Sequence, residues 1–183
     1  IAGFAVQNAY ELNYEQDPEA VTALVNIGAQ VVNINVLRHG VPVFTRDIMT
    51  GGAQYTEEIQ KALSISFEEA ERIKVGATPG YDDQVQDVIP QEVEQAMRSV
   101  SDTVIGEISR SLDFFGATSV DARITKVVLS GGGSKISGFA NAFAERTGLE
   151  TSSMNPLAFN CWAPSPNPCA ALAEPSPQPC PSH

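Results

Sequence analysis

Residues 32–36 alternate valine or isoleucine with asparagine, and this alternation predicts a half-buried β-strand. A mostly apolar run over residues 21–27 comes before it, and a turn at His39 and Gly40 leads into a third run over residues 41–48. Because only short turns separate the three runs, they are expected to form an antiparallel meander. Further along, "ITKVVLS" predicts a short buried strand and "LETSSM" one more strand.

Other segments show apolar residues at helical spacing. Residues 1–13 place an apolar face on one side of a predicted helix, made of Ile1, Phe4, Ala5, Ala9 and Leu12. After Gly51 and Gly52, a second helix is predicted with Tyr55, Ile59, Ala62 and Leu63 on one face. A third begins after Ser66, because Ser66 and Glu69 have the spacing of a capping box.

A long amphipathic helix is predicted from Pro90 to about Phe115, with proline in its first turn. Its apolar stripe consists of Val93, Met97, Val100, Val104, Ile108, Leu112 and Phe115. The segment "KISGFANAFAERTG" predicts one more helix, closed by Gly148. Strands and helices in this order indicate an α/β fold in which helices cover a mixed sheet.

The end of the chain has a different composition. The segment "CWAPSPNPCAALAEPSPQPCPSH" alternates proline with small residues, so it is expected to be a disordered tail over residues 159–183. Its three cysteines, Cys161, Cys169 and Cys180, match no zinc or haem spacing. A proline-rich ligand for a partner's aromatic groove is the alternative interpretation of this segment.

Charge and hydropathy exclude two classes of partner. The formal net charge of −11 argues against a nucleic-acid-binding surface. No apolar run approaches the roughly 20 residues that cross a bilayer, so no direct membrane insertion is expected. We therefore expect a cytoplasmic protein. The chain begins at Ile1, inside a helical pattern, which suggests a fragment with further sequence upstream.

Two glycine-bearing turns follow buried strands and carry the candidate chemistry. "VNIGAQ" and "VVLSGGGSKISGF" each run from a strand straight into glycine, which lets main chain approach a ligand closely. The second turn is expected to open a helix, whose N-terminal amides would suit an anion or a nucleotide. Each motif alone is weak evidence, but two such turns with a glycine-initiated helix between them favour a nucleotide site.

The ordered series "NIGAQVVNINVLRHG", "MTGGAQYTEEIQKAL", "FEEAERIKVG" and "VVLSGGGSKISGF" resembles the second half of actin-like (ribonuclease H-like) ATPases. With "FAVQNAYELN" before it, the series is similar to the PilM family of type IV pilus assembly proteins, relatives of the cell-division protein FtsA. The resemblance implies an inter-lobe helix and loop over residues 1–20 and subdomains IIA and IIB over 21–158.

The resemblance also implies which residues bind ATP. A second phosphate motif would consist of Asn26, Gly28, Ala29 and Gln30, and an adenosine motif of Gly131, Gly132, Gly133 and Ser134. Glu71 and Lys74 match two residues on one helix that contact ribose or adenine in actin-like ATPases. Gly52 matches the start of the neighbouring helix. Without the resemblance, Glu71 and Lys74 would be an exposed helical ion pair.

Two departures from the family pattern affect the expected chemistry. Asn26 stands where actin-like proteins usually have aspartate, so the charge that helps to hold hydrated Mg²⁺ is lost. Val32 replaces a threonine, which removes a hydroxyl contact. We therefore expect ATP and Mg²⁺ binding, with at most weak hydrolysis, and only in a protein that has both lobes.

The resemblance implies a scaffold at the cytoplasmic face of the inner membrane. Its partner would be the cytoplasmic N-terminal peptide of the membrane protein PilN, at a site expected upstream of Ile1. The sequence leaves open an FtsA-like filament protein, a sugar- or acetate-kinase-type enzyme, and an α/β domain without any ligand.

Overall fold

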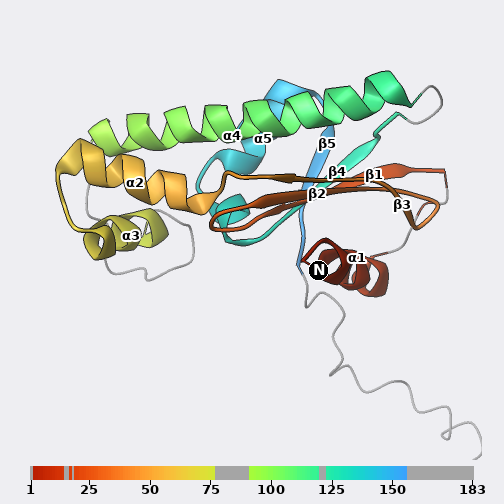
Figure 1. Cartoon of the computed structure of the whole chain (residues 1–183), viewed down its shortest axis with the longest axis horizontal. Helices are drawn as coiled ribbons and strands as arrows, with labels where there is room; N and C mark the ends of the chain where they lie inside the picture. Colours follow the sequence, from red (N-terminus) through yellow and green to blue (C-terminus); the bar gives the residue numbers. More distant parts are fainter. Residues whose placement is uncertain (1, 15–16, 18, 77–90, 120–122, 156–183) are drawn as a thin grey trace, which may run out of the picture.

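The computed structural model describes residues 2–14, 17, 19–76, 91–119 and 123–155 (Figure 1). Pro90, where the long helix was expected to begin, and the expected tail over 159–183 lie outside these described residues. In chain order the elements are α1 (Ala2–Asn13), β1 (Val21–Ile27), β2 (Val32–Arg38), β3 (Val41–Ile48), α2 (Gly52–Leu63), α3 (Phe67–Gly76), α4 (Gln91–Thr118), β4 (Lys126–Ser130), the 3-10 turn η1 (Gly132–Lys135), α5 (Phe139–Thr147) and β5 (Glu150–Ser153).

The strands form one mixed sheet in the order β3-β2-β1-β4-β5. β1, β2 and β3 make the predicted antiparallel meander, and β4 and β5 add to it in parallel. The turn between β2 and β3 lies at His39 and Gly40, which both have positive φ. The α/β fold class predicted from the sequence is therefore confirmed.

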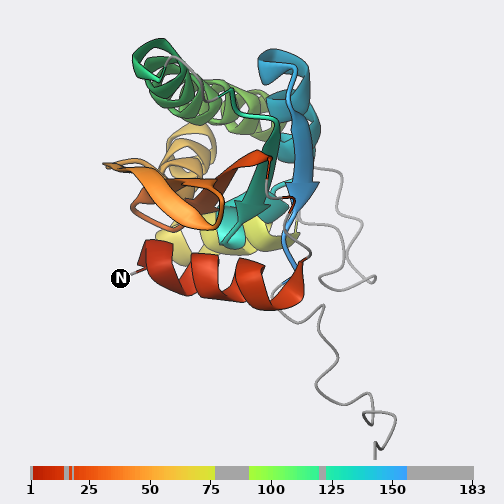
Figure 2. The same ribbon diagram turned by 90° about the vertical axis from the view of Figure 1, so that its right-hand side faces the viewer.

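One face of the sheet carries the main hydrophobic core beneath α4 and α5, and the core continues between α4 and α2 beyond the end of the sheet (Figure 1). In Figure 2, α4 and α5 lie on one side of the sheet and α1 lies on the opposite side. Every residue of the apolar stripe predicted for α4 is buried. Tyr55 of α2 is fully buried in this core, and its hydroxyl lies 3.0 Å from Ser101 Oγ of α4. Burial raises the pKa of Tyr55 to about 12, although the Ser101 hydrogen bond opposes the rise.

The opposite face of the sheet is covered in part by α1, and here the predicted face of the helix is wrong. Phe4 and Leu12 are 64% and 73% exposed. The helix instead buries Gln7 and Tyr10, and Tyr10 packs in a small cluster with Leu24, Leu37 and Val128 of the sheet.

Polar contacts explain why this side of α1 faces the sheet. Asn35 Nδ2 donates to Gln7 Oε1 at 3.2 Å, and Gln7 Nε2 donates to the Gly40 carbonyl oxygen at 3.2 Å. Asn35, predicted on the polar side of a half-buried strand, is consequently only 3% exposed. A buried amide is tolerated at this position because it is hydrogen-bonded.

Two helix starts were predicted from local sequence, with different outcomes. The capping box is confirmed, because the Ser66 N–H donates to Glu69 Oε2 at 3.0 Å and the Glu69 N–H donates to Ser66 Oγ at 3.3 Å. The prediction that the glycine-rich turn opens a helix is wrong. α5 begins only at Phe139, after Gly138 with φ 76°, and the turn itself forms η1.

Candidate functional site

The two glycine turns lie side by side at one end of the sheet. β1 and β4 are parallel neighbours, with Asn26 paired to Ser130, so the chain leaves both strands at the same edge. A Cβ placed on Gly131 would lie 2.5 Å from the Ile27 carbonyl oxygen and 2.7 Å from Asn26 Oδ1. The predicted phosphate and adenosine motifs are therefore brought together by the fold.

The three glycines of the second turn lie in different structural environments. Gly131 has φ +85°, a conformation that favours glycine, in addition to its close approach to β1. A Cβ on Gly133 would lie 2.3 Å from Ile27 Cγ2, so this residue must be bare for packing. A Cβ on Gly132 would meet nothing within 4 Å. Main chain at Gly132 thus faces open space that a ligand could enter.

Ser134, the last residue of the predicted adenosine motif, makes a hydrogen bond inside the turn. Its hydroxyl donates to the Gly131 carbonyl oxygen at 2.7 Å, and the side chain is buried. Ser134 therefore fixes the shape of the glycine turn.

The first turn is tied to the N-terminus of α2. The Gly28 N–H donates to the Val31 carbonyl oxygen at 3.1 Å, which closes the turn. The Gly52 N–H then donates to the Gly28 oxygen at 2.9 Å, and the Ala53 N–H donates to the Ala29 oxygen at 2.7 Å. These bonds satisfy two of the free amides at the start of α2. The Gly52 amide is consequently engaged with the turn, while Ala29 and Gln30 are exposed beside it.

A row of four polar side chains crosses the sheet at this end, one from each of β4, β1, β2 and β3. Ser130 Oγ donates to Asn26 Oδ1 at 3.4 Å, and Asn26 Nδ2 donates to Asn33 Oδ1 at 3.2 Å. Asn33 Nδ2 donates to Asp47 Oδ1 at 2.7 Å. We call Ser130, Asn26, Asn33 and Asp47 the polar row.

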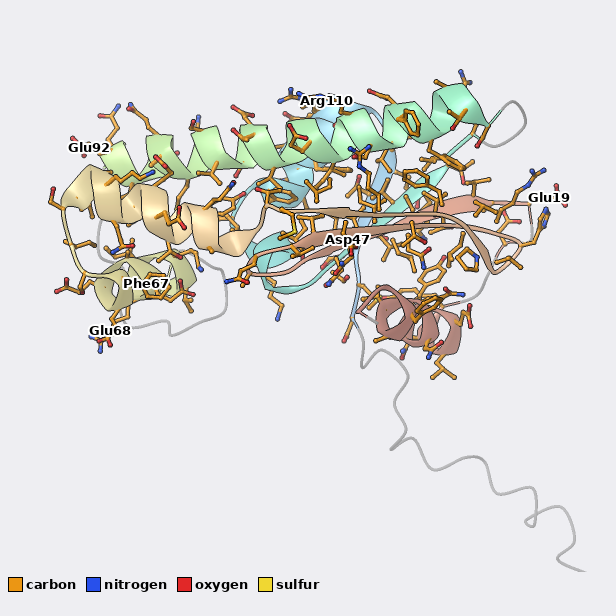
Figure 3. The ribbon with its side chains drawn as sticks, viewed as in Figure 1. Glu19, Asp47, Phe67, Glu68, Glu92 and Arg110 are labelled. Carbon is orange, nitrogen blue, oxygen red and sulfur yellow. The ribbon has the colours of Figure 1, made fainter. Side chains whose placement is uncertain are left out.

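Of the polar row, only Asn26 was predicted from the sequence. The other three follow from strand register, which pairs Asn26 with Asn33 and Asn33 with Asp47. Figure 3 shows Asp47 on the side of the sheet that α1 occupies. Val32 lies on the opposite side, fully buried in the main core, so a hydroxyl at position 32 would not reach the polar row. The departure expected at Val32 therefore does not bear on this site.

Glu71 and Lys74 form more than an exposed ion pair. Lys74 Nζ donates to Glu71 Oε2 at 2.6 Å, and also to the Gly52 carbonyl oxygen at 3.3 Å and to Thr56 Oγ1 at 3.0 Å. Thr56 Oγ1 in turn donates to Glu71 Oε2 at 2.6 Å. The Lys74 side chain is only 15% exposed. This network joins α3 to the first turn of α2.

Electrostatics in this network favour the ionised carboxylate. Burial tends to raise the pKa of Glu71, but the hydrogen bonds from Lys74 and Thr56 and the charge of Lys74 together hold the pKa below its usual value. Through Gly52, the network reaches the turn at Gly28. Glu71 and Lys74 are thus linked to the glycine turns by α2.

These features fit a nucleotide. Bare main chain at Gly132 and the exposed turn at residues 29–30 leave room for a ligand, and the amide and carboxylate oxygens of the polar row are the donors that Mg²⁺ and its water shell prefer. Among the described residues no group of three or more His, Cys, Asp or Glu side chains could hold a metal alone. A cation here would need the phosphates of a nucleotide as well.

A separate open groove of about 950 Å³ lies between α4 and α5. Two arginines that line it already have acidic partners, since Arg110 pairs with Glu107 at 2.9 Å and Arg146 lies 3.9 Å from Asp102. The groove does not include the glycine turns or the polar row.

Solved structures place this fold in a known class. The lobe is similar to an archaeal actin homologue (18% identity, TM-score 0.56, covering 84% of this chain and 48% of that one) and to MreB5 of Spiroplasma citri bound to AMPPNP (15%, 0.59, 81% and 52%). The chain therefore has the α/β fold of one lobe of an actin-like protein.

The family assignment is more specific than the fold class. Residues 1–167 match the family model of the type IV pilus assembly protein PilM, so the chain belongs to that family. It is also similar to a solved PilM-PilN type IV pilus biogenesis complex, with 25% identity and a TM-score of 0.67 over 85% of this chain. The match covers 41% of that chain, so this sequence spans less than half of its relative. Among the described residues, every helix is too short or too polar to cross a membrane.

Proposed function

We propose that this lobe forms one wall of an ATP-binding cleft in a cytoplasmic scaffold of the type IV pilus machinery. The observation that carries the proposal is the juxtaposition of the two glycine turns, with open space over Gly132. The first lobe of the protein would supply the other wall, and ATP would act as a ligand that sets the angle between lobes.

Each candidate residue has a role in this proposal. Main chain at Gly28, Ala29 and Gln30 would face the phosphates, because backbone amides in a tight turn suit an anion. The Ala29 and Gln30 amides would be the donors, since the Gly28 N–H already donates to the Val31 oxygen. Gly131, Gly132 and Gly133 would lie against the base and ribose, held in shape by Ser134. Glu71 and Lys74 would approach the adenosine from α3, and Gly52 would hold the phosphate turn through its amide.

The partner proposal rests on the family and on the likeness to the PilM-PilN complex. We propose that the two-lobe protein binds the cytoplasmic N-terminal peptide of PilN, and that this contact brings the protein to the inner membrane. Because the site is expected outside this lobe, a fluorescent PilN peptide should bind the two-lobe protein and not this chain alone. Equal binding to both would contradict the assignment of the site.

The ATP proposal is tested by filling the open space at Gly132. In a protein with both lobes, Gly132→Val should lower ATP affinity at least ten-fold in calorimetric titration, because the side chain would occupy ligand space and its Cβ would meet no protein atom within 4 Å. Gly116→Ala is the matched control, since a Cβ there also meets nothing within 4 Å but lies on α4. Unchanged affinity in Gly132→Val, with the fold intact, would contradict the proposed site.

A further inference from the structure

We propose that Asp47 supplies the negative charge that this lobe presents to the hydrated divalent cation of a bound nucleotide. The inference rests on the proposed function and assigns to Asp47 the part that aspartate at position 26 would otherwise play. Asn26 is neutral here, and the polar row joins it to Asp47 through a single intermediate residue, Asn33.

The hydrogen bonds of the polar row have one consistent direction, and Asp47 sets it. An ionised carboxylate can only accept, so the Asn33 amide must turn its NH₂ group toward Asp47. Asn33 Oδ1 then faces β1 and accepts from Asn26 Nδ2. The Asn26 oxygen is consequently directed toward β4, where it accepts from Ser130 Oγ and lies beneath Gly131. Asp47 thus orients both amides and aims the Asn26 oxygen at the candidate site.

The charge of Asp47 is not neutralised by the described part of the lobe. Asp47 is exposed and makes no ion pair with any described residue. Glu71 offers the contrast, because Lys74 and Thr56 both bond to it. Asp47 is also the only charged member of the polar row. A carboxylate beside amide oxygens is a set of hard oxygen donors, which suits Mg²⁺ and its bound water.

The position of the polar row on the sheet supports a role toward a ligand. In the next polar pair along β2 and β3, Thr45 is exposed, but Asn35 is buried and donates to Gln7 of α1. The polar row lies beyond that cover, where Asn26 and Asn33 are partly exposed. The sheet therefore buries Asn35 beneath α1 and leaves the polar row accessible beside the glycine turns.

A structural role for Asp47, as an anchor for the edge strand β3, predicts different behaviour from a charge role. Asp47→Asn removes the charge but keeps an oxygen that can accept from Asn33, so the polar row and the fold should survive. The double variant Asp47→Asn with Asn26→Asp reverses the polar row. The new carboxylate at position 26 would then accept from both Ser130 and Asn33, and the new amide at position 47 would donate to Asn33. Charge returns to the polar row with every bond satisfied.

The test is the Mg²⁺ dependence of nucleotide affinity in the two-lobe protein, measured by calorimetry with ATP in Mg²⁺ and in EDTA. Coupling between two ligands typically spans about 5- to 150-fold. We expect Asp47→Asn to reduce the Mg²⁺ enhancement by roughly ten-fold without lowering ATP affinity in EDTA or the melting temperature, and the double variant to restore it. Asp47→Asn with undiminished enhancement would overturn the inference, as would a double variant that fails to restore it.

A measurement on the wild-type protein guards against variants that fold poorly. On addition of Mn²⁺ with ATP, the amide NMR signals of residues 33 and 47 should broaden, and the signal of Asp102 on α4 should not. Broadening absent near Asp47 while the nucleotide binds would overturn the inference and leave the proposed function intact. If the wild-type protein binds no nucleotide in either Mg²⁺ or EDTA, both the inference and the proposed function are overturned.

Discussion

Gly51→Ala is predicted to separate the phosphate turn from α2. The Gly51 backbone has φ 174°, which any residue adopts, so the effect of the substitution is steric and not a matter of backbone conformation. A Cβ at this position would lie 2.5 Å from the Gly28 oxygen and 2.7 Å from the Ala29 oxygen. Both contacts are with backbone, which cannot rotate away as a side chain would. The start of α2 must therefore shift away from the turn.

The expected cost follows from the hydrogen bonds that the shift breaks. The Gly52 and Ala53 amides donate to the Gly28 and Ala29 oxygens, and each such bond contributes about 0.5–1.5 kcal/mol net. Gly51→Ala should therefore lower the free energy of unfolding by about 1–3 kcal/mol. With a urea dependence of about 1–3 kcal/mol per M, the unfolding midpoint should fall by about 1 M.

Gly52→Ala is the matched control, one residue further along. Its Cβ would make its nearest contact at 3.6 Å, an ordinary separation, and alanine is favoured over glycine in a helix by about 0.5–1 kcal/mol. Urea unfolding of this chain, followed by circular dichroism, should place Gly51→Ala below wild type and Gly52→Ala at or above it. Equal midpoints for the two variants would refute the reasoning that α2 and the turn are in close contact.

Three further predictions follow from the site. Because the folded-state pKa of Glu71 is lowered, its stabilising contribution is present above the unfolded pKa of about 4.3 and is lost as pH falls through the folded pKa. The difference in melting temperature between wild type and Glu71→Gln should accordingly shrink below that pH, and a difference that persists to about pH 2 would contradict the cause. Asn26→Asp places a second carboxylate on the polar row, so stability without Mg²⁺ should fall, and in the two-lobe protein ATP turnover or its Mg²⁺ dependence should rise; a flat response in both assays counts against the account of position 26. This chain alone offers one wall of the cleft, so calorimetry should find ATP binding weaker than millimolar, and micromolar affinity would be inconsistent with a two-lobe site.

Much of the fold was predictable because the strands and α4 have strong periodic patterns. Residues 21–27 and 41–48 form strands at the predicted bounds, and the α4 stripe is buried as expected. On α1 the same periodicity predicted the wrong buried face. Periodicity finds an apolar side but not what it contacts, and here hydrogen bonds from Gln7 and packing of Tyr10 decided which side met the sheet.

The candidate site was predictable where glycine marked it and where the family resemblance extended to Asn26, Glu71 and Lys74. Bare main chain at Gly28 and Gly131 has a clear sequence signal, since few other residues would fit. Asp47 has none, because it is distant from Asn26 in sequence and reaches the polar row only through two strand registers. An exposed aspartate near the end of a strand is otherwise an ordinary solvated residue.

The most direct test of the central claim is a crystal structure of the two-lobe protein with AMPPNP. The account predicts phosphates against the main chain of residues 28–30 and the base and ribose over Gly131–Gly133. A nucleotide bound elsewhere, or side chains of the first lobe filling the space over Gly132, would contradict it.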